Sequence, residues 1–202
     1  MGDSRSDQGR RRFLIAATSV VGGVGGAAAV VPFVMSMLPS ERAKAAGAPV
    51  EVDISKVEPG MLLSVEWRGK PVWVVNRTKE MLDRLAQNDS FLRDPKSDDS
   101  DQPESCKNPL RSHEDKPNYL VVTGVCTHLG CSPSARMKAG PESGMGDSWP
   151  GGFFCPCHGS KFDLAARVFQ GVPAPTNLTI PPYTYLSDTR LLIGQEKPKG
   201  TA

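Results

Sequence analysis

The sequence predicts a mainly β head, built from antiparallel strands, on a single N-terminal transmembrane helix. Three observations lead to this prediction: a long uncharged apolar run near the N-terminus, several short segments in which apolar and polar residues alternate, and two segments rich in Cys and His that adjoin strand signals. Alternation with a period of two is typical of strands that bury one face. With 202 residues, the chain has room for one modest domain plus such an appendage.

Residues 1–12 are predicted to be a polar cytoplasmic N-terminus. They end in Arg10, Arg11 and Arg12, and Phe13 and Leu14 follow directly. Two arginines, any residue and then Phe-Leu before an apolar segment resemble the twin-arginine export signal, whose pathway carries folded proteins that already hold a cofactor. The same arginines would also keep this end of the chain in the cytoplasm by the positive-inside rule, and we expect both readings to hold.

The apolar run covers residues 13–38 and contains no charged side chain in 26 residues. As a helix with about 1.5 Å of rise per residue, it is long enough to cross a hydrocarbon core of about 30 Å with some tilt. A cleavable signal is the alternative, because Ala43-Lys44-Ala45 has the form of a cleavage site. The run is much longer than the apolar part of such signals, which is about 7 to 15 residues, so we expect an uncleaved membrane anchor.

Residues 39–49 are predicted to be a flexible hinge, because small residues lie between two prolines and Gly47 interrupts them. Residues 50–202 then form the head. A short helix is expected after Thr78 as its cap and as far as Leu85. Residues 87–117 are polar and irregular. Strand signals cover residues 50–54, 63–67, 72–76, 119–124, 177–180, 184–186 and 190–193.

The charge distribution argues against a nucleic-acid partner. The formal net charge is +2, and the first 44 residues hold six Lys or Arg against three Asp or Glu. The rest of the chain therefore carries 18 basic against 19 acidic residues. The basic excess is local and adjoins the apolar run, where it serves membrane topology.

The residues that carry chemistry lie in two short segments, Cys126-Thr-His128-Leu-Gly-Cys131 and Cys155-Pro-Cys157-His158-Gly-Ser160. One Cys and one His from each segment make two thiolates and two imidazoles, which is a complete ligand set for one metal centre. A structural zinc module could use the same four residues. It would leave unexplained the additional Cys in each segment and the membrane anchor.

Two residues outside these segments could also bear chemistry. His113 has no partner at ligand spacing and is expected to be an ordinary surface histidine. Cys106 is expected to be a free thiol, because the ligand set is complete without it.

The two segments resemble the cluster-binding loops of Rieske iron-sulfur proteins, specifically the quinol-oxidising kind found in cytochrome bc complexes. Replacement of two cysteines by two histidines on one iron defines that centre. The resemblance implies one [2Fe-2S] cluster, with Cys126 and Cys155 on the inner iron and His128 and His158 on the outer iron. It also implies a disulfide between Cys131 and Cys157, which requires an oxidising compartment.

The resemblance extends to positions around the cluster. It implies a cluster-binding subdomain at about residues 119–176, with a third, proline-containing loop at residues 171–175. The 26 residues between His128 and Cys155 are more than is usual in the family, and we expect a surface excursion there. Ser160 matches the position from which high-potential members donate a hydrogen bond to a sulfide. Phe162 stands where many of them have Tyr, and the loss of this donor predicts a lower redox potential.

These features together lead to the functional expectation. The chain would be the iron-sulfur subunit of a bacterial ubiquinol-cytochrome c reductase, not a complete enzyme alone. It would take one electron from quinol, with His158 contacting the quinol, and deliver the electron to a c-type haem. The expected partners are cytochrome b and a c-type cytochrome in a dimeric complex of the inner membrane, with the head in the periplasm. The small Rieske subunit of a periplasmic arsenite oxidase is the alternative within redox proteins.

Overall fold

A computed structural model describes residues 4–196 of the chain, which divide into two compact units on either side of the bond between Ala45 and Ala46. Within the first unit, the stretch Asp7–Met35 is long and apolar enough to cross a membrane. This stretch belongs to helix α1 (Ser4–Met35), which also includes the arginines before the apolar run, since arginine is a good helix former, and contains Pro32 near its end. The segment expected as a hinge contains a second helix of six residues, α2 (Glu41–Ala46).

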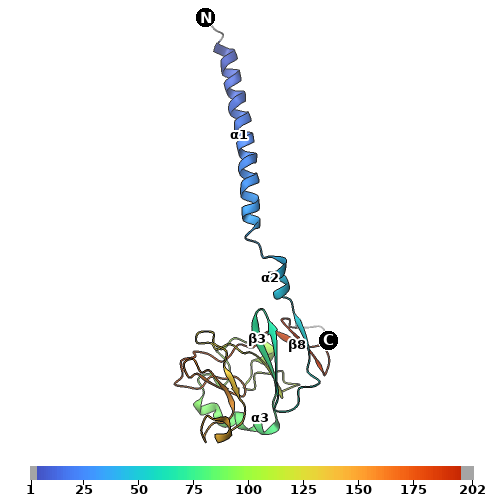
Figure 1. The fold of residues 1–202 in the computed structure, drawn as a ribbon, viewed down its shortest axis with the longest axis vertical. Coiled ribbons are helices and arrows are strands. Elements are labelled where there is room, and N and C mark those ends of the chain that lie inside the picture. Colours follow the sequence, from blue (N-terminus) through green and yellow to red (C-terminus); the bar gives the residue numbers. More distant parts are fainter. Residues whose placement is uncertain (1–3, 197–202) are drawn as a thin grey trace. The chain divides into compact units, whose positions relative to one another are not determined.

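The described part of the head, residues 50–196, contains three antiparallel sheets of three strands each. Figure 1 shows strands of the head as arrows. The first has the order β1-β9-β8, so the first strand of the head pairs with the last one. Val52 lies opposite Leu191 in this sheet, and both side chains are buried. The strands are β1 (Val50–Asp53), β8 (Tyr183–Tyr185) and β9 (Arg190–Ile193).

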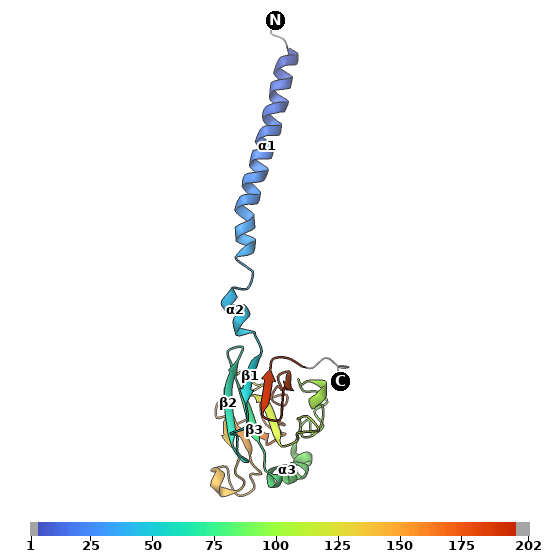
Figure 2. The ribbon, with the colours of Figure 1, turned by 90° about the vertical axis from the view of Figure 1, so that its right-hand side faces the viewer.

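The second sheet has the order β2-β3-β4, and β2 and β3 form a hairpin that Figure 2 shows side by side. Arg68 and Gly69 make the turn with φ of 53° and 70°, the positive values that a tight hairpin turn requires. The strands, all three predicted, are β2 (Leu62–Trp67), β3 (Lys70–Asn76) and β4 (Tyr119–Thr123).

The third sheet was not predicted, and it carries the second Cys-His segment between two of its strands. Its strands are only three residues long: β5 (Ser134–Arg136), β6 (Gly152–Phe154) and β7 (Lys161–Asp163). A Cβ atom on Gly152 would lie 2.0 Å from the carbonyl oxygen of Phe162, so only glycine permits this pairing. The surface excursion expected between His128 and Cys155 therefore contains two strands, β5 and β6, which pair with each other.

The strand predicted at residues 177–180 is wrong. The Asn177 side chain instead accepts a hydrogen bond from the Val168 NH through Oδ1. Its Nδ2 donates to the Asp94 carboxylate and to the Ser97 hydroxyl. The neighbouring Leu178 NH donates to the carbonyl of Ala166. Because these groups bond to partners in different segments, no continuous strand ladder forms here.

The predicted helix after Thr78 is α3 (Lys79–Leu85), and it lies beyond the end of β3 (Figures 1 and 2). The Thr78 hydroxyl accepts a hydrogen bond from the Met81 NH, as a helix cap should. Met81 is buried along with Leu85, whereas Leu82 is only half-buried. Short 3₁₀ turns follow at η1 (Ala86–Phe91), η2 (Glu104–Cys106) and η3 (Pro141–Ser143).

The hydrophobic core joins the second and third sheets. Trp73 of β3 stacks on Phe153 of β6 with ring centroids 5.2 Å apart. Gly124 makes this possible, because a Cβ there would lie 2.3 Å from the Trp73 ring. Apolar burial of this kind stabilises by roughly 25 cal/mol per Å² of area. The third sheet is thereby fixed to the rest of the head.

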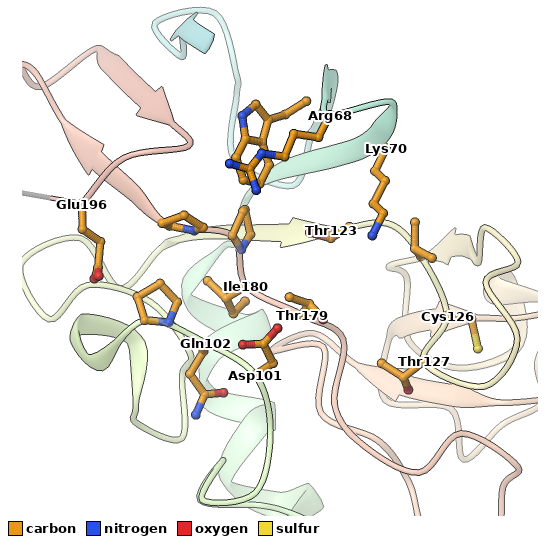
Figure 3. Close-up of a pocket in the computed structure, with 15 residues that line it drawn as sticks. Arg68, Lys70, Asp101, Gln102, Thr123, Cys126, Thr127, Thr179, Ile180 and Glu196 are labelled. Carbon is orange, nitrogen blue, oxygen red and sulfur yellow. The ribbon is translucent and has the colours of Figure 1, made fainter. Parts of the chain in front are cut away.

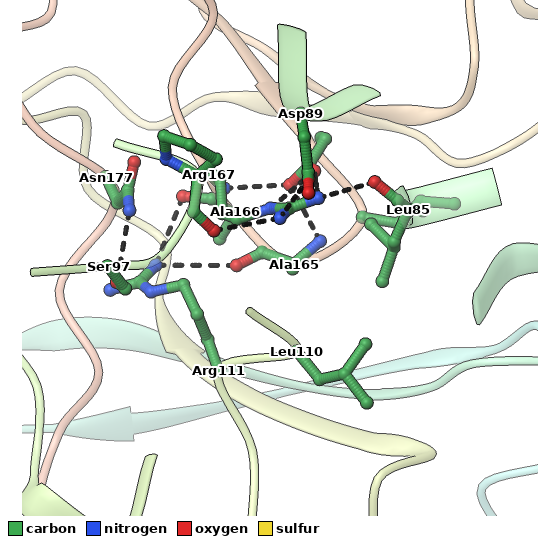
Figure 4. Close-up of polar contacts among 12 residues, drawn as sticks. Leu85, Asp89, Ser97, Leu110, Arg111, Ala165, Ala166, Arg167 and Asn177 are labelled. Atoms are coloured by element: carbon green, nitrogen blue, oxygen red, sulfur yellow. Dashed lines mark hydrogen bonds and ion pairs between the residues drawn. The ribbon is translucent and has the colours of Figure 1, made fainter. Parts of the chain in front are cut away.

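The polar segment at residues 87–117 contains one buried arginine, Arg111, and contacts two others, Arg77 and Arg167. All three are among the largest fully buried side chains. Arg111 donates to the carbonyls of Ala165 and Ala166, as Figure 4 shows. Burial lowers the pKa of Arg111 to about 10, partly offset by the charge of Asp163. A polar sequence segment thus contributes interior structure.

Cys106, at the end of η2, and His113, which follows it, were expected to be a free thiol and a surface histidine. Cys106 is fully buried and has no disulfide partner in the described residues, as predicted, and its thiol donates to the Tyr183 hydroxyl. His113 differs from the expected surface histidine, because it is half-buried and its ring lies 4.5 Å from that of Tyr183.

Candidate metal centre

The two Cys-His segments fold into loops with the same backbone hydrogen bonds. In the first loop, which follows β4, the Cys126 NH donates to the Cys131 carbonyl at 2.7 Å, and the Gly130 NH donates to the Cys126 carbonyl at 3.0 Å. In the second loop, between β6 and β7, the Cys155 NH donates to Ser160 and the Gly159 NH to Cys155, at 2.8 and 3.0 Å. In each loop, the backbone of the first cysteine is therefore hydrogen-bonded to the fifth and sixth residues of the loop.

Glycine occupies the fifth position of both loops for a physical reason. Gly130 and Gly159 have φ of 82° and 79°, in the left-handed region that side chains disfavour. The spacing from cysteine to glycine is identical in the two loops, whereas the histidine stands one residue later in the second loop. The sequence shows this correspondence once the loops are aligned on their first cysteines.

The first cysteines of both loops point into the protein. Cys126 and Cys155 are 3% and 2% exposed. Burial raises the pKa of the Cys126 thiol, and the adjacent Cys155 raises it further, against the lowering effect of the His128 backbone NH and the Ser160 hydroxyl. Two thiolates here would need a bound cation to compensate their charge.

The two histidines lie together at the outer side of the same site. Their ring centroids are 4.8 Å apart and the ring planes are at 90°. His128 is half-buried and His158 is exposed. The donor set is therefore ordered from inside to outside, with two thiols buried and two imidazoles toward the surface. These residue types in this order fit a centre with one thiolate-bound and one imidazole-bound iron.

Cys131 and Cys157 form a disulfide that joins the two loops, with Cα atoms 6.7 Å apart. The Cys155 sulfur lies within 4.8 Å of both disulfide sulfurs. This trio of sulfurs is not a metal site, because the two bonded sulfurs carry no thiolate. The disulfide instead holds the loops at a fixed separation across the end of the head.

Ser160 and Phe162 lie directly behind the second loop, and both are fully buried. The Ser160 hydroxyl accepts a hydrogen bond of 3.0 Å from the Ala174 NH, which belongs to the proline-containing third loop. Phe162 is in β7 opposite Phe153. The third loop is also linked to the first, since the Thr127 hydroxyl donates to the Thr176 carbonyl at 2.8 Å.

A cavity of about 490 Å³ is lined in part by residues of the first loop, and it was not predicted from the sequence. Figure 3 shows Arg68 and Lys70 at this cavity, with Cys126 and Thr127 at another part of its wall. The Arg68 guanidinium lies 4.4 Å above the Trp67 ring. From the sequence, Arg68 and Lys70 indicated only a hairpin turn, because they are more than 50 residues away from Cys126 along the chain.

Comparison with known proteins agrees with this geometry. Residues 94–183 match the model of the Rieske [2Fe-2S] domain, and residues 1–40 match that of the "Ubiquitinol-cytochrome C reductase Fe-S subunit TAT signal". The latter match confirms the predicted twin-arginine signal.

Relatives cover nearly the whole chain. The chain is 64% identical over 188 residues to the ubiquinol-cytochrome c reductase iron-sulfur subunit of Allochromatium vinosum, covering 93% of this chain and 89% of that protein. The subunit of the same name from Bradyrhizobium diazoefficiens is 45% identical over 186 residues, covering 92% of this chain and 94% of that protein. A chain of a hyperthermophilic respiratory Complex III structure is 28% identical with a TM-score of 0.46, covering 89% of this chain and 99% of that one.

Proposed function

Since this chain belongs to the family of ubiquinol-cytochrome c reductase iron-sulfur subunits, we propose that its head takes one electron and one proton from a quinol and passes the electron to a c-type haem. The chain carries a Rieske-type [2Fe-2S] cluster and is a subunit of complex III, an oxidoreductase. One observation carries the proposal: two loops joined by a disulfide each hold one buried thiol and one imidazole, and the two imidazole rings lie 4.8 Å apart.

The four ligands have distinct tasks in this proposal. Cys126 and Cys155 hold the inner iron, and His128 and His158 hold the outer one. When bound, the cluster supplies a one-electron acceptor whose imidazole ligands give it a higher potential than an all-cysteine centre would have. The burial of the thiols keeps water from the inner sulfurs.

We assign the quinol contact to His158. Its imidazole is exposed, whereas that of His128 is half-buried, so His158 is the more accessible to a substrate. If one ring nitrogen of His158 binds the metal, the other can accept a hydrogen bond from the quinol hydroxyl and take up its proton when it has lost its own proton. Ser160 and the disulfide hold the second loop, which keeps this imidazole in place.

The family membership supports the proposed partners, and features of the chain itself support the proposed orientation. The chain is anchored in the membrane as part of a bc complex. Cytochrome b takes the second quinol electron and a c-type cytochrome the first, within a dimeric complex. The arginines before the apolar run support a cytoplasmic N-terminus, and the disulfide supports a periplasmic head. Residues 39–49 act as the hinge on which the head moves between partners. The zinc module is set aside because the chain is a Rieske protein.

Substitution of a ligand histidine tests the proposal. Membranes that contain the complex with His158→Gln are expected to lose both the electron paramagnetic resonance signal of the reduced cluster and quinol-dependent cytochrome c reduction. His113→Gln is the matched control, because it changes the one histidine outside the site and should preserve both. An unchanged cluster signal in the His158 variant would refute the ligand assignment.

A further inference from the structure

The exposed residue Arg93 contacts the third loop of the metal centre from a distant part of the chain. Its guanidinium donates to the carbonyl of Pro175 at 3.3 Å through Nη1 and to the carbonyl of Val172 at 3.2 Å through Nη2. These two carbonyls lie on either side of Pro173 and Ala174. A planar guanidinium presents two donors in a fixed fork, so it can hold both carbonyls together.

The backbone around Arg93 is itself firmly held. The Arg93 NH donates to the Val168 carbonyl at 3.0 Å, and Leu92 before it is 2% exposed. The buried carboxylate of Asp94 after it accepts hydrogen bonds from the Ser100 hydroxyl and the Asp98 NH. The Arg93 side chain therefore extends from a rigid support, although its own end is exposed.

A further hydrogen bond connects the third loop with Ser160, at the end of the second Cys-His segment. The Ala174 NH, between the two carbonyls that Arg93 holds, donates to the Ser160 hydroxyl at 3.0 Å. Because that oxygen accepts from Ala174, its own proton is free to point elsewhere. Ser160 is fully buried, and its carbonyl accepts a hydrogen bond of 2.8 Å from the Cys155 NH, so the hydroxyl lies beside the second cysteine loop. The position of Ala174 thus sets the direction of the Ser160 proton.

We propose that Arg93 is a positioning residue of the metal centre: it fixes the third loop so that Ala174 orients the Ser160 hydroxyl toward the sulfur site. This inference rests on the proposed function, because it assumes that the bound group at these sulfurs is the redox centre. A hydrogen bond to sulfur stabilises the more negative, reduced state. Loss of Arg93 should therefore lower the midpoint potential and loosen the loop.

Two polar substitutions of Arg93 test this in the intact membrane complex. Arg93→Gln removes the fork, and Arg93→Lys keeps the charge and one donor. The Gln variant is expected to shift the midpoint downward and to lose its cluster to a chelator roughly tenfold faster, as expected for the loss of about one net hydrogen bond. The Lys variant should lie between the Gln variant and the wild type. Arg190→Gln is the matched control, because Arg190 is another exposed arginine, pairs with Glu51 in the first sheet, and should change neither quantity.

A double-variant cycle shows whether Arg93 acts through Ser160. Ser160→Ala should lower the midpoint, and adding Arg93→Gln to it should lower the midpoint no further. Additive shifts, or an Arg93→Gln midpoint equal to that of the wild type, would overturn the inference. A wild-type complex without the resonance signal of a reduced [2Fe-2S] cluster would instead contradict the proposed function, so the two failures are distinguishable.

Discussion

The Asp163 carboxylate and the Arg167 guanidinium form an ion pair of 2.8 Å in which both side chains are at most 1% exposed. The guanidinium also donates to Asp89 at 2.8 Å and to the Leu85 carbonyl at 2.7 Å (Figure 4). Asp163 ends β7, immediately behind the second Cys-His loop, whereas Leu85 and Asp89 belong to α3 and η1. One buried charge pair therefore joins the cluster-bearing sheet to the helical segment.

Arg167→Met should destabilise the head strongly, because it leaves the Asp163 carboxylate buried without its partner. The expected loss is about 3–5 kcal/mol in the free energy of unfolding, measured by chemical denaturation of the purified chain. Arg190→Gln breaks the exposed pair with Glu51 and should cost less than about 1 kcal/mol. Equal losses in the two variants would show that burial does not decide the effect.

Removal of the Cys131–Cys157 disulfide should weaken retention of the cluster more than folding of the rest of the head. The bridge spans 26 residues of sequence and connects the two ligand loops directly. A stability loss of about 2–4 kcal/mol is typical for a closed loop of this kind. In the double variant Cys131→Ser, Cys157→Ser, cluster absorbance should decay faster during incubation in air, whereas Cys106→Ser should retain it. Equal decay in both variants would argue against the clamp.

Phe162→Tyr should raise the midpoint potential of the cluster. Phe162 is fully buried in β7 next to the second loop, so an added hydroxyl must find a partner nearby, and a ligand sulfur is the acceptor expected from the family. A redox titration measures the shift, with Phe162→Leu as a control that alters packing without adding a donor. A midpoint that does not rise with Tyr would count against the predicted link between Phe162 and a low potential.

His113 should make the head less stable as the pH falls. Burial lowers the pKa of His113 below its ordinary value of 6.5, although Asp115 and Glu196 partly oppose the change. The unfolded chain therefore binds this proton more readily than the folded head, so stability is full above pH 6.5 and declines as the pH falls toward the lower folded pKa. The free energy of unfolding, measured between about pH 5 and pH 8, should depend less on pH in His113→Gln than in the wild type. The same pH dependence in both proteins would refute this prediction.

Strands with a long alternating pattern could be predicted from the sequence, and shorter ones could not. β3 has seven residues and β9 follows a turn signal, so local pattern was sufficient. The three-residue strands β5, β6 and β7 are too short to show a period. They exist because Gly152 allows close approach to Phe162, a contact between residues that are ten apart in the chain.

The residue types of the candidate site could be predicted, but their surroundings could not. Cys126, His128, Cys155 and His158 stand in two short segments, where spacing along the chain is itself informative. Arg93 lies 79 and 82 residues from the carbonyls it holds. Nothing in a polar segment marks such a residue, because its role depends on which distant backbone comes to lie beside it.

The sequence by itself determined the apolar run, the Cys and His residues of the candidate site and the two-loop organisation, because each depends on residues that are near one another along the chain. Only the tertiary structure decided how these parts meet. It placed the imidazoles of His128 and His158 at 4.8 Å and buried Arg167 against Asp163. Long-range contacts of this kind form only when the whole core packs, since many weak apolar contacts together fix the position of each segment.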